Sequence, residues 1–108
     1  MGIAQFIETE TEFDALLSRD SLLVVDFTAT WCGPCRLIAP FIDQLAETYQ
    51  DRANVYKIDI DQHKAVAKKF GIRSIPAVLF FQDGQLIKTL VGSKTYEEFS
   101  QELESCIN

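Results

Sequence analysis

Residues 22–35 read LLVVDFTATWCGPC. The stretch opens with an apolar run, residues 22–27, which only Asp26 interrupts. Continuous apolar runs of this length are typical of strands buried on both faces, so we expect this strand at the centre of a sheet. The stretch closes with two cysteines separated by Gly33 and Pro34, where the strand gives way to a helix.

A long helix is predicted directly after this stretch. Apolar residues at positions 37, 38, 41, 42, 45 and 46 recur with helical spacing up to about residue 49, and Pro34 suits the first turn. Residues 55–60 are predicted to form the next strand. Asp61 is expected to cap a helix that runs to Phe70, with Gly71 as its C-terminal stop.

Capping signals predict a helix near each end of the chain. Thr9 followed by Glu12 is a capping-box signature, and so is Thr95 followed by Glu98. Residues 3–7, which precede the first of these helices, suit a short strand. We therefore expect the chain to open with a strand and a helix and to close with a helix.

A hairpin signal completes the order of elements. Asp83-Gly84 separates the apolar runs at 77–81 and 86–91, which predicts two antiparallel strands. The order is then β-α-β-α-β-α-β-β-α, and it predicts an α/β fold with a central mixed five-stranded sheet and four helices covering both faces. A chain of 108 residues, 47% of them hydrophobic, suits one domain over residues 1–108.

Charge and hydropathy argue against several classes of partner. The formal net charge is -6, the wrong sign for a surface that binds nucleic acid. The longest apolar runs, 22–25 and 77–81, are far shorter than the roughly 20 residues that span a bilayer. The N-terminus lacks the basic and apolar segments of a secretion signal, so we expect a cytoplasmic protein without a membrane anchor.

Cys32 and Cys35 are the candidate reactive groups. Helix N-termini carry unpaired N–H donors and the positive end of the helix dipole, and both lower the pKa of a thiol. A disulfide that closes a four-residue loop stabilises a fold by only about 2 kcal/mol, against about 4.7 kcal/mol for a 100-residue loop. Redox chemistry therefore explains the close spacing better than a structural crosslink does.

The remaining metal-ligating residues do not predict a metal site. A zinc site would need Cys32, Cys35, Cys106 and His63 to converge without a second closely spaced pair of ligands. His63 is expected on the solvated surface. For Cys106 two interpretations stay open, a small buried hydrophobe or a regulatory, dimer-forming thiol near a fraying helix end.

Several charged residues also allow two interpretations. Asp26 is either a buried carboxyl that resists ionisation or an exposed acid at a strand end. Lys57 either brings its ammonium toward Asp26 and modulates its titration or is simply solvated. Asp59 and Asp61 are interpreted as surface and capping residues rather than paired catalytic carboxylates.

The string from Asp26 to Cys35, followed by Ile75-Pro76 and Gly92, resembles the thioredoxin family over essentially the whole chain. The resemblance implies the thioredoxin fold and a thiol–disulfide oxidoreductase that acts as a general protein disulfide reductase. Cys32 would form a mixed disulfide that Cys35 resolves, passing electrons to client proteins without a bound cofactor. A thioredoxin reductase, nicotinamide-flavin or ferredoxin linked, would recharge a monomeric protein.

The resemblance also assigns roles to individual residues. Asp26 would accept the proton of Cys35 through water, and Pro76 would be cis although X-Pro bonds are usually trans. The backbone of Ile75 would pair with an extended substrate. A flat, partly exposed docking patch beside the exposed sulfur of Cys32 is expected from Trp31, Gly33, Pro34, Ile75, Pro76 and Gly92. The alternative is a binding or scaffold subunit with an incidental dithiol.

Overall fold

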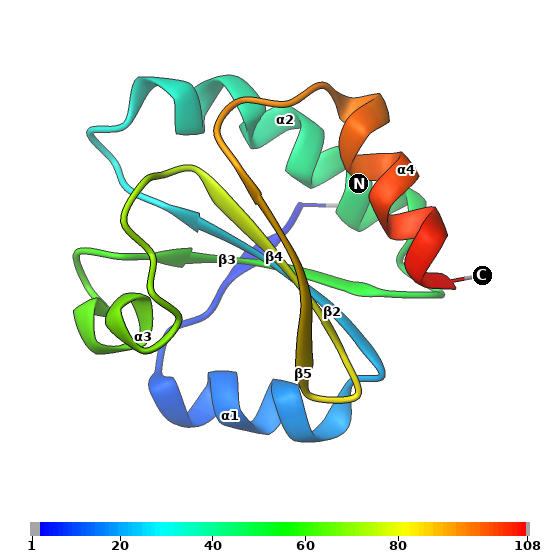
Figure 1. Ribbon diagram of the computed structural model, residues 1–108, viewed down its shortest axis with the longest axis horizontal. Coiled ribbons are helices and arrows are strands. Elements are labelled where there is room, and N and C mark those ends of the chain that lie inside the picture. Colours follow the sequence, from blue (N-terminus) through cyan, green and yellow to red (C-terminus); the bar gives the residue numbers. More distant parts are fainter. Residues whose placement is uncertain (1–2, 108) are drawn as a thin grey trace.

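The computed structural model describes residues 3–107, so the two ends of the predicted domain over 1–108 lie outside it. The order of strands and helices is the predicted one (Figure 1). The elements are β1 (Gln5–Phe6), α1 (Glu10–Arg19), β2 (Leu22–Thr28), α2 (Gly33–Thr48), β3 (Asn54–Asp59), α3 (Lys64–Lys69), β4 (Ala77–Gln82), β5 (Gln85–Val91) and α4 (Tyr96–Ile107).

The strands form one mixed sheet in the order β1-β3-β2-β4-β5. β1, β3 and β2 run parallel, whereas β4 and β5 are antiparallel to their neighbours. β2 is the middle strand, and residues 22–27 are all buried, which confirms the prediction from its apolar run. Parallel β2 and β3 end at the same edge of the sheet, so the segments that follow them meet there.

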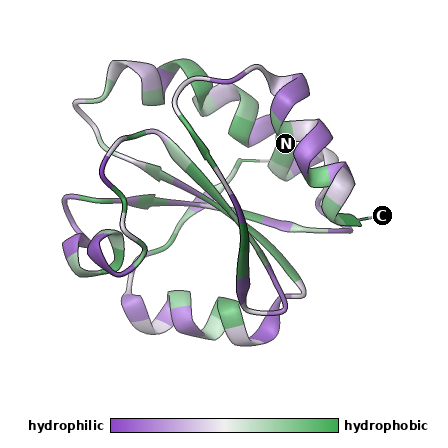
Figure 2. Ribbon diagram, in the orientation of Figure 1, coloured by the Kyte–Doolittle hydropathy of each residue, from purple (hydrophilic) through white to green (hydrophobic). Residues whose placement is uncertain are grey.

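Helices cover both faces of the sheet, as predicted. α2 and α4 pack on one face and α1 and α3 on the other (Figure 1), and the apolar interior between them follows the strands (Figure 2). Side chains along β2 alternate between the faces: Val24 packs on the side of α2, and Val25 and Phe27 on the side of α1. Asp26 therefore faces α2.

The two predicted capping boxes and the predicted hairpin turn are confirmed. Thr9 Oγ1 accepts a hydrogen bond from the N–H of Glu12 at 3.0 Å, at the start of α1. Before α4, the N–H of Glu98 donates to Thr95 Oγ1 at 3.1 Å, and the N–H of Thr95 donates to Glu98 Oε1 at 3.0 Å. The predicted hairpin turns at Asp83-Gly84, where both residues have positive φ.

Two predictions about helices are wrong. α3 begins at Lys64 and Asp61 does not cap it, because Asp59 Oδ1 accepts from the N–H groups of Asp61 and Gln62 and forms the preceding turn. Leu37, which the spacing places on the apolar face of α2, is 69% exposed, because it projects away from the sheet. Helical spacing is degenerate at the edge of an apolar stripe, which is where position 37 lies.

Candidate functional site

Cys32 and Cys35 stand at the start of α2 and are joined by a disulfide bond. Cys32 is the N-cap residue, and its Sγ accepts a hydrogen bond from the backbone N–H of Cys35 at 3.2 Å. The two Cα atoms lie 5.2 Å apart. Once the bond is reduced, the helix N-terminus and this N–H are placed to stabilise a thiolate on Cys32, and that thiolate stays a prediction from the sequence position.

Neighbouring side chains cover both cysteines. Cys32 is 4% exposed and Cys35 is 2% exposed, in a small cluster with Ala29. Ile60 and Ile75 pack against this cluster, and the carbonyl oxygen of Ile75 lies 3.9 Å from Cys32 Sγ. The prediction of an exposed sulfur on Cys32 is therefore wrong, because Ile75, in the segment before β4, packs against it.

The predicted docking residues surround the disulfide with unequal exposure. Trp31 is 64% exposed, which decides against a core tryptophan, and Pro34 is exposed as well. Gly33, Ile75 and Gly92 are half-buried. These five residues therefore present surface beside the cysteines.

Pro76 does not belong to this surface, because it is buried. The Ile75–Pro76 peptide bond is cis, which confirms the expectation from the resemblance. The carbonyl oxygen of Pro76 accepts a hydrogen bond from the N–H of Gly92 at 2.8 Å. Pro76 thus fixes the position of Gly92 and contributes little contact area of its own.

Asp61 is part of the site, although the sequence suggests only a capping role. Its Oδ2 accepts a hydrogen bond from Trp31 Nε1 at 2.7 Å, so it holds the exposed indole beside the disulfide. The two residues follow β2 and β3, whose parallel ends meet at one edge of the sheet. That topology is the only signal in the sequence that places Asp61 near Trp31.

Asp26 is a buried carboxyl on β2, the strand that leads into the cysteine pair. It is 1% exposed, which rules out the exposed interpretation, and its Oδ1 has no hydrogen-bond partner within residues 3–107. Burial raises the pKa of Asp26 to about 7, Lys57 opposes this shift and the negative charge of Asp43 adds to it. This carboxyl can therefore bind and release a proton near neutral pH.

Lys57 is held by a carboxylate that the sequence does not reveal. It pairs with Asp26 in the register of β2 and β3, and its side chain is only 12% exposed, so the solvated interpretation is wrong. Lys57 Nζ lies 3.0 Å from Asp43 Oδ1, and the same oxygen accepts the N–H of Ala4 at 3.1 Å. Asp43 lies on α2, and the sequence alone gives no indication that it faces β3.

Asp43→Asn is expected to lower the pKa of Asp26 below its value of about 7, because one negative charge disappears while Lys57 keeps its positive charge. The amide oxygen of asparagine can still accept the N–H of Ala4. Carboxyl-carbon NMR across pH 5 to 9 would measure the titration of Asp26. Asp14→Asn, an exposed change on α1, is the matched control. An Asp26 midpoint that is the same in both variants contradicts this electrostatic account.

The remaining candidates stand apart from the disulfide. Cys106 is a half-buried free thiol on α4 that packs against the core, and burial raises its pKa, followed by the charge of Glu102. His63 is half-buried at the start of α3. Within residues 3–107, no three His, Cys, Asp or Glu side chains gather as a metal site would require. No helix in the same range is long and apolar enough to cross a membrane.

Known proteins with similar sequences belong to one family. The sequence profile of the family "Thioredoxin" matches residues 4–105, which contain both cysteines of the disulfide and the residues described around it. The chain is 45% identical to thioredoxin of Griffithsia pacifica over 93 residues, covering 86% of this chain and 84% of that protein. It is 41% identical to thioredoxin 1 of Synechococcus elongatus over 93 residues, covering 86% and 87%.

Solved structures agree with these sequence matches. A single-site mutant of thioredoxin from Halobacterium salinarum superposes with a TM-score of 0.90 at 32% identity, covering 97% of this chain and 92% of that one. Thioredoxin of Malassezia sympodialis gives a TM-score of 0.91 at 33% identity, covering 100% and 94%. Sequence and fold are therefore similar to the same group of proteins.

Proposed function

This chain belongs to the thioredoxin family, and from the position of Cys32 and Cys35 at the start of α2 we infer how it works as a thiol–disulfide oxidoreductase. The inference depends mainly on the disulfide between these cysteines at a helix N-terminus. We propose that the reduced pair donates electrons to disulfides of client proteins. The chemistry needs no metal or bound cofactor, because sulfur atoms alone carry the electrons.

The exchange takes place in two steps that conserve electrons. First, the Cys32 thiolate attacks one sulfur of the client disulfide, the client S–S bond breaks, and the second client sulfur leaves as a thiolate and takes up a proton. Then the Cys35 thiolate attacks Cys32 Sγ and releases the first client sulfur. Two electrons have passed to the client, and the Cys32–Cys35 disulfide has formed.

Asp26 is proposed to accept the proton that Cys35 loses in the second step. Its pKa of about 7 and its position on the α2 side of β2 support this role. Water between the carboxyl and the thiol would carry the proton. Lys57 is a positioning residue here, because its charge acts on Asp26 and Asp43 fixes its ammonium.

Ile75 is proposed to receive the client backbone. It lies just before β4, so its amide and carbonyl groups are outside the ladder that joins β4 to β2 and β5. An extended client segment can pair with them, while Trp31, Gly33, Pro34 and Gly92 provide the flanking surface. This arrangement would bring a client disulfide close to Cys32 Sγ.

Membership of the family implies that a thioredoxin reductase renews the reduced pair and that disulfide proteins are its clients. Assays with a nicotinamide-flavin and with a ferredoxin-linked reductase would identify the electron source. A monomeric protein acting in the cytoplasm remains our proposal. The alternative of a scaffold subunit with an incidental dithiol is not favoured, since family and cysteine pair agree.

Insulin reduction driven by dithiothreitol tests the proposed function. We expect the protein to accelerate the reaction catalytically, and prior alkylation of the reduced protein to abolish the acceleration. Cys106→Ser is the matched control and should keep full activity, because Cys106 lies on α4, away from the disulfide. If the alkylated protein matched the untreated protein, or if neither exceeded dithiothreitol alone, reductase activity would be refuted.

A further inference from the structure

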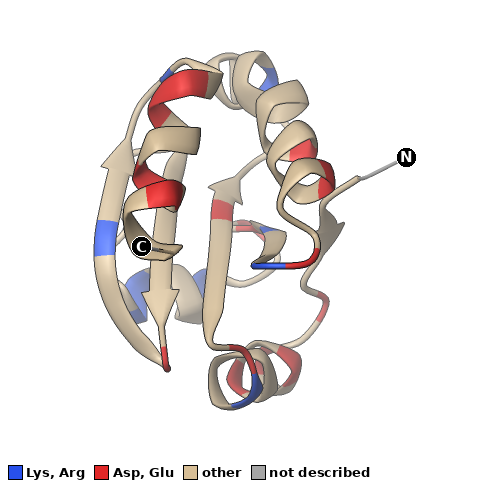
Figure 3. Ribbon diagram, turned by 90° about the vertical axis from the view of Figure 1, so that its right-hand side faces the viewer, with Lys and Arg blue, Asp and Glu red and all other residues tan. Residues whose placement is uncertain are grey.

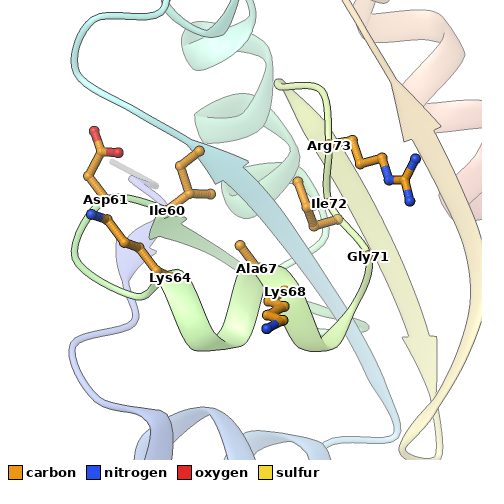
Figure 4. A pocket seen from close by; sticks show the side chains of 8 residues that line it. All are labelled: Ile60, Asp61, Lys64, Ala67, Lys68, Gly71, Ile72 and Arg73. Carbon is orange, nitrogen blue, oxygen red and sulfur yellow. The ribbon is translucent and has the colours of Figure 1, made fainter.

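A pocket of about 410 Å³ lies beside α3 and is lined by residues of α3 and of the segments that precede and follow it. Its floor is apolar and consists of Ile60, Ala67 and Ile72. Figure 4 shows Asp61 and Lys64 at one end of this pocket and Arg73 at the other, with the apolar residues between them. We call it the α3 pocket.

The rim of the α3 pocket is positively charged. Lys64, Lys68 and Arg73 line it, and among residues 3–107 none of the three has a carboxylate partner within ion-pair distance. The single acid, Asp61, is engaged by Trp31 Nε1. Unpaired cations attract an anionic partner more strongly than cations already held in ion pairs.

The charge of the pocket differs from that of the rest of the protein. The whole chain carries a formal net charge of -6, and acidic residues occur along the length of α4 (Figure 3). α3 instead reads KAVAKK, with three lysines and no acid. An acidic partner segment that approaches this protein is therefore drawn to the α3 pocket and repelled from α4.

The α3 pocket adjoins the redox site. Ile60 lines its floor and also packs against the Cys32–Cys35 cluster. Asp61 lines the same pocket and binds Trp31, which is exposed beside the cysteines. A client whose disulfide lies at Cys32 therefore places the residues flanking its own cysteine within reach of the pocket.

We propose that the α3 pocket selects clients that carry an acidic side chain, aspartate or glutamate, a few residues from the disulfide to be reduced. The carboxylate would pair with one of the cations of the rim, and the aliphatic part of the segment would cover the apolar floor. This inference rests on the proposed reductase function and adds a preference among its clients. It adds no step to the exchange itself.

Two matched peptide disulfides provide the test, one with glutamates flanking its cysteine and one with glutamines. We expect the reduced protein to react with the acidic peptide about tenfold faster in kcat/KM at low salt. The advantage should shrink toward unity at 1 M salt, where the Debye length is about 3 Å. The neutral peptide measures the reductase activity independently of the pocket.

Variants then locate the preference. A variant that combines Lys64→Gln, Lys68→Gln and Arg73→Gln should lose the acidic preference and reduce the neutral peptide at an unchanged rate. The control variant, Lys88→Gln with Lys94→Gln on the far side, should change neither the preference nor that rate. Lys64→Glu with Lys68→Glu should reverse the preference in favour of a lysine-flanked peptide. Equal rates for acidic and neutral peptides in the unmodified protein, or a preference that survives the pocket variants, would overturn the inference. Failure to reduce even the neutral peptide would instead refute the proposed function.

Discussion

Cys35→Ser is expected to stop disulfide exchange halfway and to leave the protein covalently attached to its client. Cys32 can still attack, because its place at the N-terminus of α2 does not depend on the second thiol. A serine hydroxyl cannot displace the client sulfur, so the mixed disulfide accumulates. Turnover should fall by about 10³-fold or more, since one of the two reacting nucleophiles is lost.

Intact-protein mass spectrometry would detect the adduct as the summed mass of one protein and one client, released by dithiothreitol. The double variant Cys32→Ser with Cys35→Ser is the control for attachment at Cys32 and should give no adduct. Adding Cys106→Ser to Cys35→Ser should leave the adduct in place, because Cys106 is half-buried and burial raises its thiol pKa. An adduct that required Cys106 would contradict the assignment of Cys32 as the attacking thiol.

Patterns of a few adjacent residues predict much of the fold. The capping boxes at Thr9 and Thr95 and the turn at Asp83-Gly84 appear as predicted, because a few adjacent residues contain the whole interaction. The apolar run of residues 22–27 predicts a strand buried on both faces, and β2 is that strand. The cysteine pair is equally local, since both members lie within one helical turn.

What the sequence does not predict depends on contacts between distant elements. Asp43 binds Lys57 because α2 crosses β3, and Asp61 binds Trp31 because β2 and β3 end at one edge of the sheet. Helical periodicity does not distinguish Asp43 from the other polar residues of α2. The burial of Cys32 likewise depends on Ile75, which is 43 residues away along the chain.

Asp26→Asn is expected to stabilise the oxidised protein at pH 8 and to have much less effect at pH 4. In the unfolded chain the carboxyl ionises near its ordinary pKa of 3.8, whereas in the folded protein its pKa is about 7. Between these values the folded state holds a proton that the unfolded state releases, so the free energy of unfolding falls as pH rises. Above about pH 8 the loss is nearly complete, because both states are ionised. The difference between these two pKa values corresponds to a loss of at most about 4 kcal/mol in the free energy of unfolding.

Urea unfolding of both proteins across pH 4 to 8.5 would measure the difference. The buried amide of asparagine has its own desolvation cost, but that cost is independent of pH, so the growth of the difference between pH 4 and pH 8 isolates the charge of Asp26. Asp20→Asn is the matched control. Asp20 is also buried, but its Oδ1 pairs with Arg19 at 2.9 Å, so its replacement should not stabilise the protein. A stability difference between Asp26→Asn and the unmodified protein that stayed constant from pH 4 to pH 8 would show that the carboxyl titrates alike in both states. The buried acid could not then serve as the proton acceptor near neutral pH.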